Sequence, residues 1–338
     1  MNPIDVGLWV GIFSTLFLLS ALSLKFKAIR VLVFIIFLIP LVFTVLFFIF
    51  KHEPISATDV NKLAFFQRFK VGCHRGSHHG VIPENSIEAY KACKAEGAQL
   101  IETDIQLTSD SVPVISHDDN TVSFTGVDKE ISQMTFAEFQ QLRFTLNNAS
   151  LLTFEQSVEW CVQNDMLMIW DVKSIDDTLV NIFETMVKKY NLYSKIIISG
   201  FNPINAYKVK SKDKNILTGF TWRSWELSSI AEDGSVPRFG SFLTIIAVFL
   251  DKILTGATRS LIIPSFLGVD MLLFHCNDVS RAQQLDGLRN DMYTVGWTTN
   301  NPAEMSFYLS ATIPFLTDNA TVVPFSTHVY NYTATGAS

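Results

Sequence analysis

Reactive side chains gather at the ends of apolar runs in the first half of this chain. His74 and Arg75 close the first run, and His117 closes the third. Glu102 and Asp104 lie two positions apart in the second run, so both carboxylates point to one face of a strand. The C-terminal ends of parallel barrel strands carry catalytic groups, so these runs are predicted to bring the five side chains together.

Asp171 and Lys173 share a face at the end of the fourth run and complete a set suited to phosphoryl chemistry. Glu102, Asp104 and Asp171 supply the hard oxygen ligands that Mg²⁺ or Ca²⁺ prefers. Such a cation neutralises phosphate charge and lowers the pKa of a coordinated hydroxyl. The three carboxylates are therefore predicted to bind a divalent cation, and Lys173 could form an ordinary ion pair with Asp171.

The basic side chains and histidines fit the same chemistry. Arg75 offers a bidentate fork for phosphate oxygens, and His74 and His117 titrate near neutrality, as a general acid and base require. Each residue also has a structural interpretation, because a single histidine at a strand end is more often structural than catalytic. The convergence of all these residues at strand ends favours the catalytic interpretation.

Two alternatives concern the loop after His74. His78 and His79 would form a zinc site with His74, although both lie in a loop flanked by glycines. Glu84 is expected to orient Arg75 rather than to contact substrate.

The elements that must position these residues alternate between strand and helix. This alternation over about 250 residues predicts an α/β fold, either a βα barrel or a doubly wound sheet. The strand candidates are Lys70–Cys73, Gln99–Leu107, Val112–Ser116, Met166–Val172, Lys195–Ser199, Asn215–Phe220, Val269–Phe274, Met292–Trp297 and Thr312–Leu316. The helix candidates are Ser86–Glu96, Thr135–Leu142, Thr153–Gln163, Asp176–Tyr190, Pro203–Lys210, Asp278–Asn290 and Pro302–Leu309. Thr153 and Asp278 are expected to be N-caps, and Pro203 and Pro302 to occupy first helical positions.

Nine strands are one more than a barrel needs, and the third is the extra one. Only four residues separate it from the second, whereas a parallel crossover needs a dozen or more, so the two are predicted to form a hairpin. Pairing Leu107 with Val112 sets Glu102 opposite His117.

An apolar insertion at about 223–266 interrupts the alternation. Phe239 to Leu250 contains no charged residue, and Leu261–Leu267 is a second apolar run. Runs of this length are usually buried or re-entrant rather than spanning. A buried helix is the leading expectation, and an interfacial lid near the active site is the alternative.

The N-terminus has the composition of membrane helices. Residues 1–50 contain nine of the 28 phenylalanines and only four charged side chains. The uncharged runs 7–24 and 31–50 are predicted to form a transmembrane hairpin, with a single anchor at 31–50 as the alternative. A linker (51–68), a barrel (69–325) and a tail (326–338) are expected to follow.

The charges between the two apolar runs predict the orientation. Lys25, Lys27 and Arg30 favour a cytoplasmic loop, which places the barrel on the lumenal or extracellular side. Three glycosylation sequons, at Asn148, Asn319 and Asn331, agree with this orientation.

Cysteine spacing and net charge exclude other classes. Cys73, Cys93, Cys161 and Cys276 fit neither a zinc nor a CxxC pattern, and buried free thiols are the default expectation, with a disulfide as the alternative. A net charge of −6 without a basic stripe argues against nucleic-acid binding.

The motifs together resemble a known family. The residues HRG (74–76), PEN (83–85), IETDIQLTSDSVPVISHD (101–118), WDVK (170–173), VGWTTN (295–300) and LTD (316–318) are similar to the signature of the glycerophosphodiester phosphodiesterases. The N-terminal hairpin and the insertion resemble the integral-membrane animal members. The resemblance implies a phospholipase-C-like TIM barrel, preceded here by two transmembrane helices.

The resemblance also implies roles for individual residues. It assigns His74 and His117 to acid–base catalysis, Arg75 and Lys173 to phosphate, and Trp297 to the pocket wall. It makes Glu102, Asp104 and Asp171 metal ligands, although many members carry Glu where Asp171 stands.

The predicted reaction is metal-dependent hydrolysis of a glycerophosphodiester to glycerol 3-phosphate and an alcohol. A lysophospholipid or an N-acylethanolamine glycerophosphodiester suits the membrane anchor and the apolar insertion, and gives a lysophosphatidic acid-like product. The alternatives are a catalytically silent, membrane-anchored binding protein on the same barrel and a phospholipase-D-like enzyme that releases a cyclic phosphate.

Overall fold

A computed structural model describes residues 11–17, 27–173 and 176–324. Its centre is a barrel of eight parallel strands in the order β5-β4-β2-β1-β9-β8-β7-β6, and a bridge between Ile198 and Thr218 joins β5 to β6. The strands are β1 (Val71–Cys73), β2 (Leu100–Leu107), β3 (Pro113–Ile115), β4 (Leu167–Val172), β5 (Ile196–Ser199), β6 (Gly219–Trp222), β7 (Met271–His275), β8 (Tyr293–Trp297) and β9 (Phe315–Thr317). The predicted TIM barrel is therefore confirmed.

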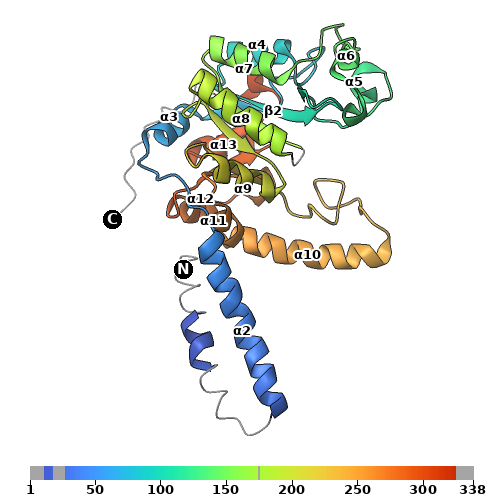
Figure 1. Cartoon of the computed structure of the whole chain (residues 1–338). Helices are drawn as coiled ribbons and strands as arrows, with labels where there is room; N and C mark the ends of the chain where they lie inside the picture. Colours follow the sequence, from blue (N-terminus) through green and yellow to red (C-terminus); the bar gives the residue numbers. More distant parts are fainter. Residues whose placement is uncertain (1–10, 18–26, 174–175, 325–338) are drawn as a thin grey trace.

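Helices surround the barrel, and the apolar helices α2 and α10 extend away from it in different directions (Figure 1). The helices are α2 (Lys27–Phe50), α3 (Val60–Arg68), α4 (Ile87–Ala95), α5 (Val122–Thr125), α6 (Phe136–Phe139), α7 (Phe154–Gln163), α8 (Asp177–Tyr190), α9 (Pro203–Lys212), α10 (Ser241–Arg259), α11 (Ile262–Leu267), α12 (Arg281–Leu288) and α13 (Pro302–Ser310). Short 3-10 turns are η1 (Ile131–Gln133), η2 (Cys276–Asp278) and η3 (Ala320–Val322).

Local sequence signals account for several helix boundaries. Thr153 forms a capping box at the start of α7, and Pro203 and Pro302 occupy the first turns of α9 and α13, as predicted. The prediction for Asp278 is wrong, because Ser280 caps α12. The Asp278 carboxylate instead accepts hydrogen bonds from the backbone and hydroxyl of Ser224.

The extra strand forms the predicted hairpin in a shifted register. β3 pairs antiparallel with β2 outside the barrel path, but Leu107 lies opposite Pro113 rather than Val112. The Thr108 hydroxyl accepts a hydrogen bond from the Val112 backbone N–H, so Val112 belongs to the turn. The expected pairing of Glu102 with His117 is therefore wrong by one residue. β6 also begins later than predicted. The backbone N–H of Asn215 donates a hydrogen bond to Oδ1 of Asp213, so Asn215 belongs to the turn before the strand.

The barrel interior changes from apolar to polar along its axis. Leu100, Leu167 and Leu316 pack in the lower half against Phe65 and Phe66 of α3, which closes the N-terminal end of the barrel. Further along β2 and β4, the inward-pointing side chains include Glu102, Asp104 and Asp171. These carboxylates form the floor of the site described below.

A buried ion-pair cluster fixes α3 to the barrel. The Nζ atoms of Lys62 and Lys210 lie 3.0 and 2.7 Å from the two carboxylate oxygens of Asp270, and all three side chains are buried. Breaking one such pair leaves a buried charge without compensation, so the cluster specifies how the chain enters the barrel. The stretch expected to be a linker thus contains a helix that packs as part of the barrel.

Two helices of the described chain are long and apolar enough to cross a membrane, at Val31–Phe50 and Ser241–Arg259. The first matches the second predicted span. Residues 11–17 of the other predicted span are helical, and the Phe17 ring stacks on that of Phe37 at 4.4 Å. The rest of that span, the loop residue Lys25 and the predicted tail at 326–338 lie outside the described residues.

The insertion and the cysteines depart from expectation. α10 is not the buried helix expected, because most of its apolar side chains are exposed. Cys73 and Cys93 form a disulfide between β1 and α4, so the expectation of free thiols is wrong for this pair. It holds for Cys161, which is free and buried, while Cys276 is free and half-buried.

Candidate active site

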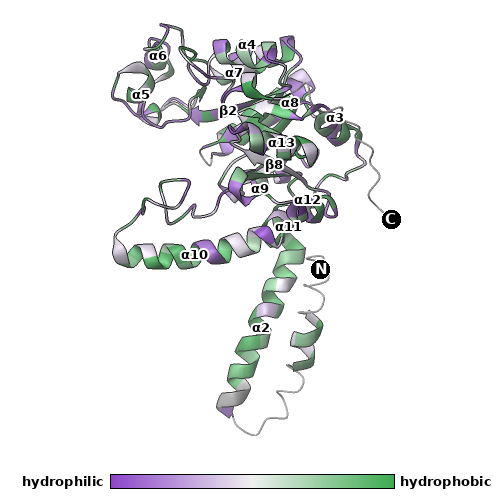
Figure 2. Cartoon of the chain, turned by 180° about the vertical axis from the view of Figure 1, so that it is seen from behind, coloured by the Kyte–Doolittle hydropathy of each residue, from purple (hydrophilic) through white to green (hydrophobic). Residues whose placement is uncertain are grey.

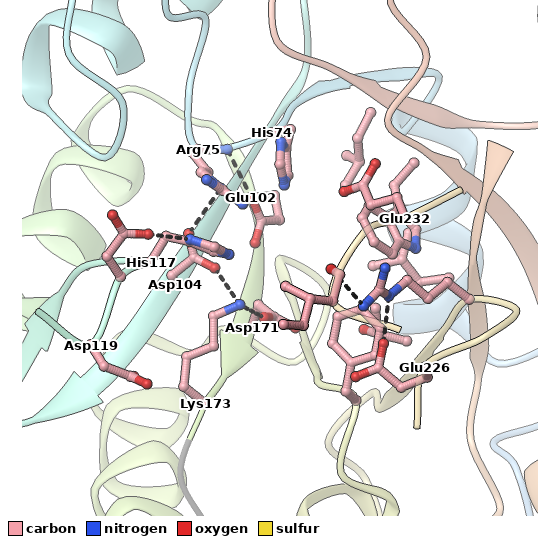
Figure 3. Close-up of a pocket in the computed structure, with 18 of the residues that line it drawn as sticks. His74, Arg75, Glu102, Asp104, His117, Asp119, Asp171, Lys173, Glu226 and Glu232 are labelled. Atoms are coloured by element: carbon pink, nitrogen blue, oxygen red, sulfur yellow. Dashed lines mark hydrogen bonds and ion pairs between the residues drawn. The ribbon is translucent and has the colours of Figure 1, made fainter. Parts of the chain in front are cut away.

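All eight predicted site residues line one cavity at the C-terminal end of the barrel strands (Figure 3). The cavity has a volume of about 940 Å³. Those residues are His74, Arg75, Glu102, Asp104, His117, Asp171, Lys173 and Trp297. They come from the ends of β1, β2, β4 and β8 and from the turn after β3, so the barrel brings together side chains more than 200 positions apart.

The three carboxylates form a buried cluster on the cavity floor. Ligand oxygens of Glu102, Asp104 and Asp171 all lie within 4.8 Å of one another, on two neighbouring strands whose register pairs Asp104 with Asp171. Burial, together with the charges of Asp104 and Asp171, raises the pKa of Glu102 well above its usual range. Burial also opposes ionisation of Asp104, but the charges of Lys173 and Arg75 outweigh it and lower the pKa of that carboxyl.

This cluster fits a divalent cation. Oδ1 of Asp171 is buried and has no hydrogen-bond partner among the described residues. The mutual repulsion that raises the pKa of Glu102 is relieved when a cation binds between the carboxylates. Oxygen donors of this kind suit Mg²⁺ or Ca²⁺.

The two basic side chains of the site, Lys173 and Arg75, lie against these carboxylates. The Lys173 Nζ is 2.8 Å from Oδ1 of Asp104 and 2.6 Å from Oδ2 of Asp171. The Arg75 guanidinium pairs with Glu84 at 3.0 Å and lies 3.4 Å from Oδ2 of Asp104. Glu84 thus contacts Arg75, as expected.

Backbone geometry fixes the loop that carries Arg75. Its backbone N–H donates to Oε2 of Glu102 at 2.9 Å, and its φ of 57° is in the left-handed region. Asn85, also left-handed, donates from Nδ2 to Oδ2 of Asp104 at 2.8 Å. The HRG and PEN motifs are therefore held against the carboxylate cluster by direct hydrogen bonds.

Each predicted catalytic histidine is oriented by a carboxylate. Nδ1 of His74 is 2.8 Å from Asp318, and Nδ1 of His117 is 2.9 Å from Asp118. An ionised carboxylate only accepts, so Nδ1–H donates in both cases and Nε2 is left for substrate chemistry. Burial opposes the charge on Asp318, but the hydrogen bond from His74 prevails and lowers the pKa of that carboxyl.

These two orienting carboxylates were missed by sequence reasoning. Asp318 belongs to the LTD motif and Asp118 directly follows His117, so a signal was present, although no spacing rule assigns either to an imidazole. Asn300 and Ser123 donate to the outer oxygens of Asp318 and Asp118, at 2.6 Å in both cases.

The opposite wall is charged and comes mainly from the insertion. Arg223 directly follows β6, is buried, and pairs with Glu226 at 2.6 Å. His275 ends β7 and lies 3.4 Å from Glu232, and contacts with Cys276 and Glu232 raise the pKa of His275 to about 9. Arg223 and His275 occupy strand-end positions that could have been found from sequence, whereas the glutamates depend on how the insertion folds back.

Trp297 lies between the two walls, as the pocket prediction requires. Its ring meets those of Phe201 and His275 edge to face, with centroids 5.6 and 5.4 Å away, and lies 6.3 Å from the His74 ring. The zinc alternative gains no support. The His79 ring contacts Glu96 at 3.0 Å instead of turning toward His74, and the carboxylate trio is the metal-type cluster found among the described residues.

A TIM barrel whose C-terminal mouth combines a buried carboxylate trio, two oriented histidines, an arginine and a lysine defines a phosphodiesterase-type site. Residues 74–321 match the model of the glycerophosphoryl diester phosphodiesterase family, and the chain belongs to this family. The predicted family resemblance is thereby confirmed, and the chain is a glycerophosphodiester phosphodiesterase by class.

Individual relatives agree with this assignment. The chain is 28% identical to human glycerophosphodiester phosphodiesterase 1 over 277 residues, which cover 79% of this chain and 82% of the relative. The bovine protein of the same name is 29% identical over 279 residues, covering 78% of this chain and 81% of the relative.

A solved phosphodiesterase from Oleispira antarctica, in complex with the product sn-glycerol-3-phosphate, has the same fold. Its TM-score is 0.59 at 18% identity, covering 76% of this chain and 96% of that one. A glycerophosphoryl diester phosphodiesterase from Silicibacter pomeroyi matches with the same TM-score, covering 78% of this chain and 96% of that one.

Proposed function

We propose that this protein hydrolyses glycerophosphodiesters, including lysophospholipids, in a reaction that depends on a divalent cation held by Glu102, Asp104 and Asp171. The observation that carries this proposal is the cavity in which two carboxylate-oriented histidines face a buried carboxylate trio. The products are glycerol 3-phosphate, or a lysophosphatidic acid-like acylated form, and an alcohol.

The side chains divide the work of the reaction. When bound, the cation neutralises phosphate charge and acidifies a coordinated hydroxyl. One of His74 and His117 takes the proton from the neighbouring glycerol hydroxyl as it attacks phosphorus, and the other protonates the departing alcohol oxygen. Water then opens the cyclic phosphate with the histidine roles reversed. Arg75 and Lys173 bind phosphate oxygens, and Trp297 lines the pocket.

Phosphorus NMR of the products tests the proposal. Glycerophosphoinositol and an acylated lysophospholipid are incubated with the full chain in detergent, with and without a chelator. The expected product is a phosphate monoester whose formation stops when the cation is removed. His117→Ala is expected to lower kcat by about 10²–10⁴-fold.

Three results contradict the proposal in different ways. A cyclic phosphate that accumulates as the final product indicates the cyclising alternative. Full activity in the chelator argues against the cation site. No turnover by the wild type, with both substrates still bound, indicates a silent binding protein.

We also propose that the protein is integral to a membrane, with the barrel on the lumenal or extracellular side. Support comes from the apolar span Val31–Phe50, from the Cys73–Cys93 disulfide, which is typical of oxidising compartments, and from the exposed sequon at Asn148.

A further inference from the structure

The α10 helix presents a continuous apolar face to solvent. Phe242, Ile245 and Phe249 are 74%, 69% and 63% exposed, and Ile253 continues the row at 50%. The spacing of three and four places these four side chains on one side of the helix. Exposed apolar surface of this extent marks an interaction site rather than ordinary protein surface.

The opposite side of α10 is tied to the first part of the insertion. Asp251, in the middle of the helix, is buried and accepts hydrogen bonds from the backbone N–H groups of Leu227 and Ser228 at 2.9 and 2.8 Å. Near the C-terminal end, Arg259 pairs with Asp278 at 2.6 Å. A spanning helix would have to break these contacts and place Asp251 in the hydrocarbon, which is costly. α10 is therefore apolar and exposed on one side, yet held by polar contacts on the other.

The membrane helix α2 meets α10 through α11. Phe47 of α2 contacts Phe266 of α11 with ring centroids 5.5 Å apart, and the backbone N–H of His52 donates to the Phe266 carbonyl at 3.0 Å. The Tyr207 hydroxyl donates to the carbonyl of Phe50, the last residue of α2. The apolar length of α2 thus ends at the level where α11 joins α10.

α2 and α10 lie crosswise, and both views show this arrangement (Figures 1 and 2). α10 leads from α11 toward the side of the barrel that carries α5, whose residues Val122 and Ser123 line the catalytic cavity. Its 19 residues span roughly 28 Å at 1.5 Å per residue. A bilayer crossed by α2 would therefore have α10 along its surface.

An apolar groove beside α10 meets the catalytic cavity. The groove has a volume of about 420 Å³ and is lined by Leu227, Phe239, Leu243, Ile246, Ala247 and Leu250. Glu226 and Arg238 line both the groove and the catalytic cavity, so the two spaces share a wall. Arg238 is held there by hydrogen bonds from Nη2 to the carbonyls of Glu226 and Ser229, both at 3.1 Å.

We propose that α10 lies in the interface of the bilayer that contains α2, and that the groove beside it receives the acyl chain of a glycerophosphodiester drawn from that bilayer. This inference rests on the proposed function, because it names how one class of substrate reaches the same site. Amphipathic helices bind membranes by burying such an apolar face at the level of the head groups. The phosphodiester then enters the charged cavity while its chain stays in apolar surroundings.

The test compares two substrates of the full chain in phosphatidylcholine vesicles. One is a long-chain lysophosphatidylcholine in the bilayer, and the other is water-soluble glycerophosphocholine. The double variant Ile245→Glu/Phe249→Glu is expected to lower kcat/KM for the lysolipid about tenfold, because charges on the apolar face weaken its binding to the bilayer interface. Activity on glycerophosphocholine is expected to stay within about twofold.

Val162→Glu provides the matched control. Val162 is a 40% exposed apolar residue of α7, on the side of the barrel away from α2, and its substitution is expected to affect neither substrate. Equal losses on both substrates in the α10 variant, or no loss on either, would overturn the inference. Loss on the lysolipid alone supports it.

A second measurement does not depend on turnover. The fluorescence of a tryptophan introduced by Phe249→Trp is expected to be quenched by lipids brominated near the top of their chains. The fluorescence of a tryptophan introduced by Val162→Trp is not expected to be quenched. Equal quenching of the two variants overturns the placement of α10, whether or not the wild type is active. A wild type that hydrolyses neither substrate contradicts the proposed function and leaves this measurement of α10 in force.

Discussion

His74 and His117 share one arrangement, in which an aspartate fixes Nδ1 and a second donor fixes the aspartate. The carboxylate of Asp318 is held by Asn300, and that of Asp118 by Ser123. Such outer contacts keep an imidazole in one tautomer and one orientation. The partners of His74 come from the other end of the barrel sequence, whereas those of His117 lie within six residues of it.

Asp318→Asn is expected to lower kcat by about tenfold or more, with KM little changed, because the amide no longer enforces the Nδ1–H tautomer of His74. Steady-state kinetics on glycerophosphocholine measures the split between kcat and KM. Asp318→Glu keeps the charge and is expected to recover part of the rate. A rise in KM at constant kcat would show that Asp318 serves substrate binding instead.

Glu102 gives a prediction about stability. Burial and neighbouring carboxylates raise the pKa of Glu102, so the folded protein keeps this proton to higher pH than the unfolded chain. Stability without a cation therefore falls as pH rises above the ordinary glutamate range. Glu102→Gln removes this cost and is expected to raise the Tm at neutral pH by about 2–4 °C, equivalent to roughly 1 kcal/mol.

Thermal unfolding with and without Mg²⁺ or Ca²⁺ provides the readout. The wild type is expected to gain stability from the cation, and Glu102→Gln to gain much less. A cation response that is the same in both proteins would contradict the role of Glu102 as a ligand.

At the scale of elements, the alternation of apolar runs was sufficient to predict every barrel strand. Hydrophobic periodicity and helix capping depend on residues close in sequence. Thr153 therefore caps its helix, and Pro203 and Pro302 begin theirs, as predicted. Features decided by distant contacts were not predictable. Asp278 does not cap α12, because its carboxylate accepts a hydrogen bond from Ser224. The β3 register is shifted because Val112 belongs to the turn that Thr108 stabilises.

The site follows the same division. Residues at strand ends were found because a parallel barrel places all such ends at one mouth. Glu226 and Glu232 were missed because the insertion brings them to the cavity by its own fold. The apolar face of α10 was expected in the core, since hydropathy cannot distinguish a side chain that packs against protein from one that stays exposed.

The Cys73–Cys93 disulfide joins the end of β1, directly before His74 and Arg75, to α4. It closes a loop with a sequence separation of 20. Cys93→Ser is expected to lower the free energy of unfolding by about 3 kcal/mol, the entropy cost of a loop of this length. Denaturant unfolding measures the loss. Cys161→Ala, which removes a buried free thiol, is the control, and equal losses in the two variants would show that the bond adds nothing beyond packing.

At the scale of the whole molecule, the proposed membrane helix α2 and the sequon at Asn148 allow the topology to be tested. α2 joins the barrel beside α9 and α11, whereas α6 and α7 lie on the side away from α2 (Figure 1). Asn148 is exposed in the connection between α6 and α7. A glycan at Asn148 would therefore point away from the bilayer and leave the α10 surface free. Asn319 differs, because its side chain caps η3 and accepts hydrogen bonds from both the backbone and the hydroxyl of Thr321.

Topology can be tested with these sequons. In sealed microsomes with the cytoplasmic side outward, the barrel is expected to resist added protease, because the basic residues Lys25, Lys27 and Arg30 favour the cytoplasmic side and so predict a lumenal barrel. Glycosidase treatment is expected to increase gel mobility, and Asn148→Gln to abolish most of that shift while activity persists. Complete digestion of residues 51–338 in intact vesicles would place the barrel in the cytoplasm. It would also remove the oxidising surroundings that the Cys73–Cys93 bond requires.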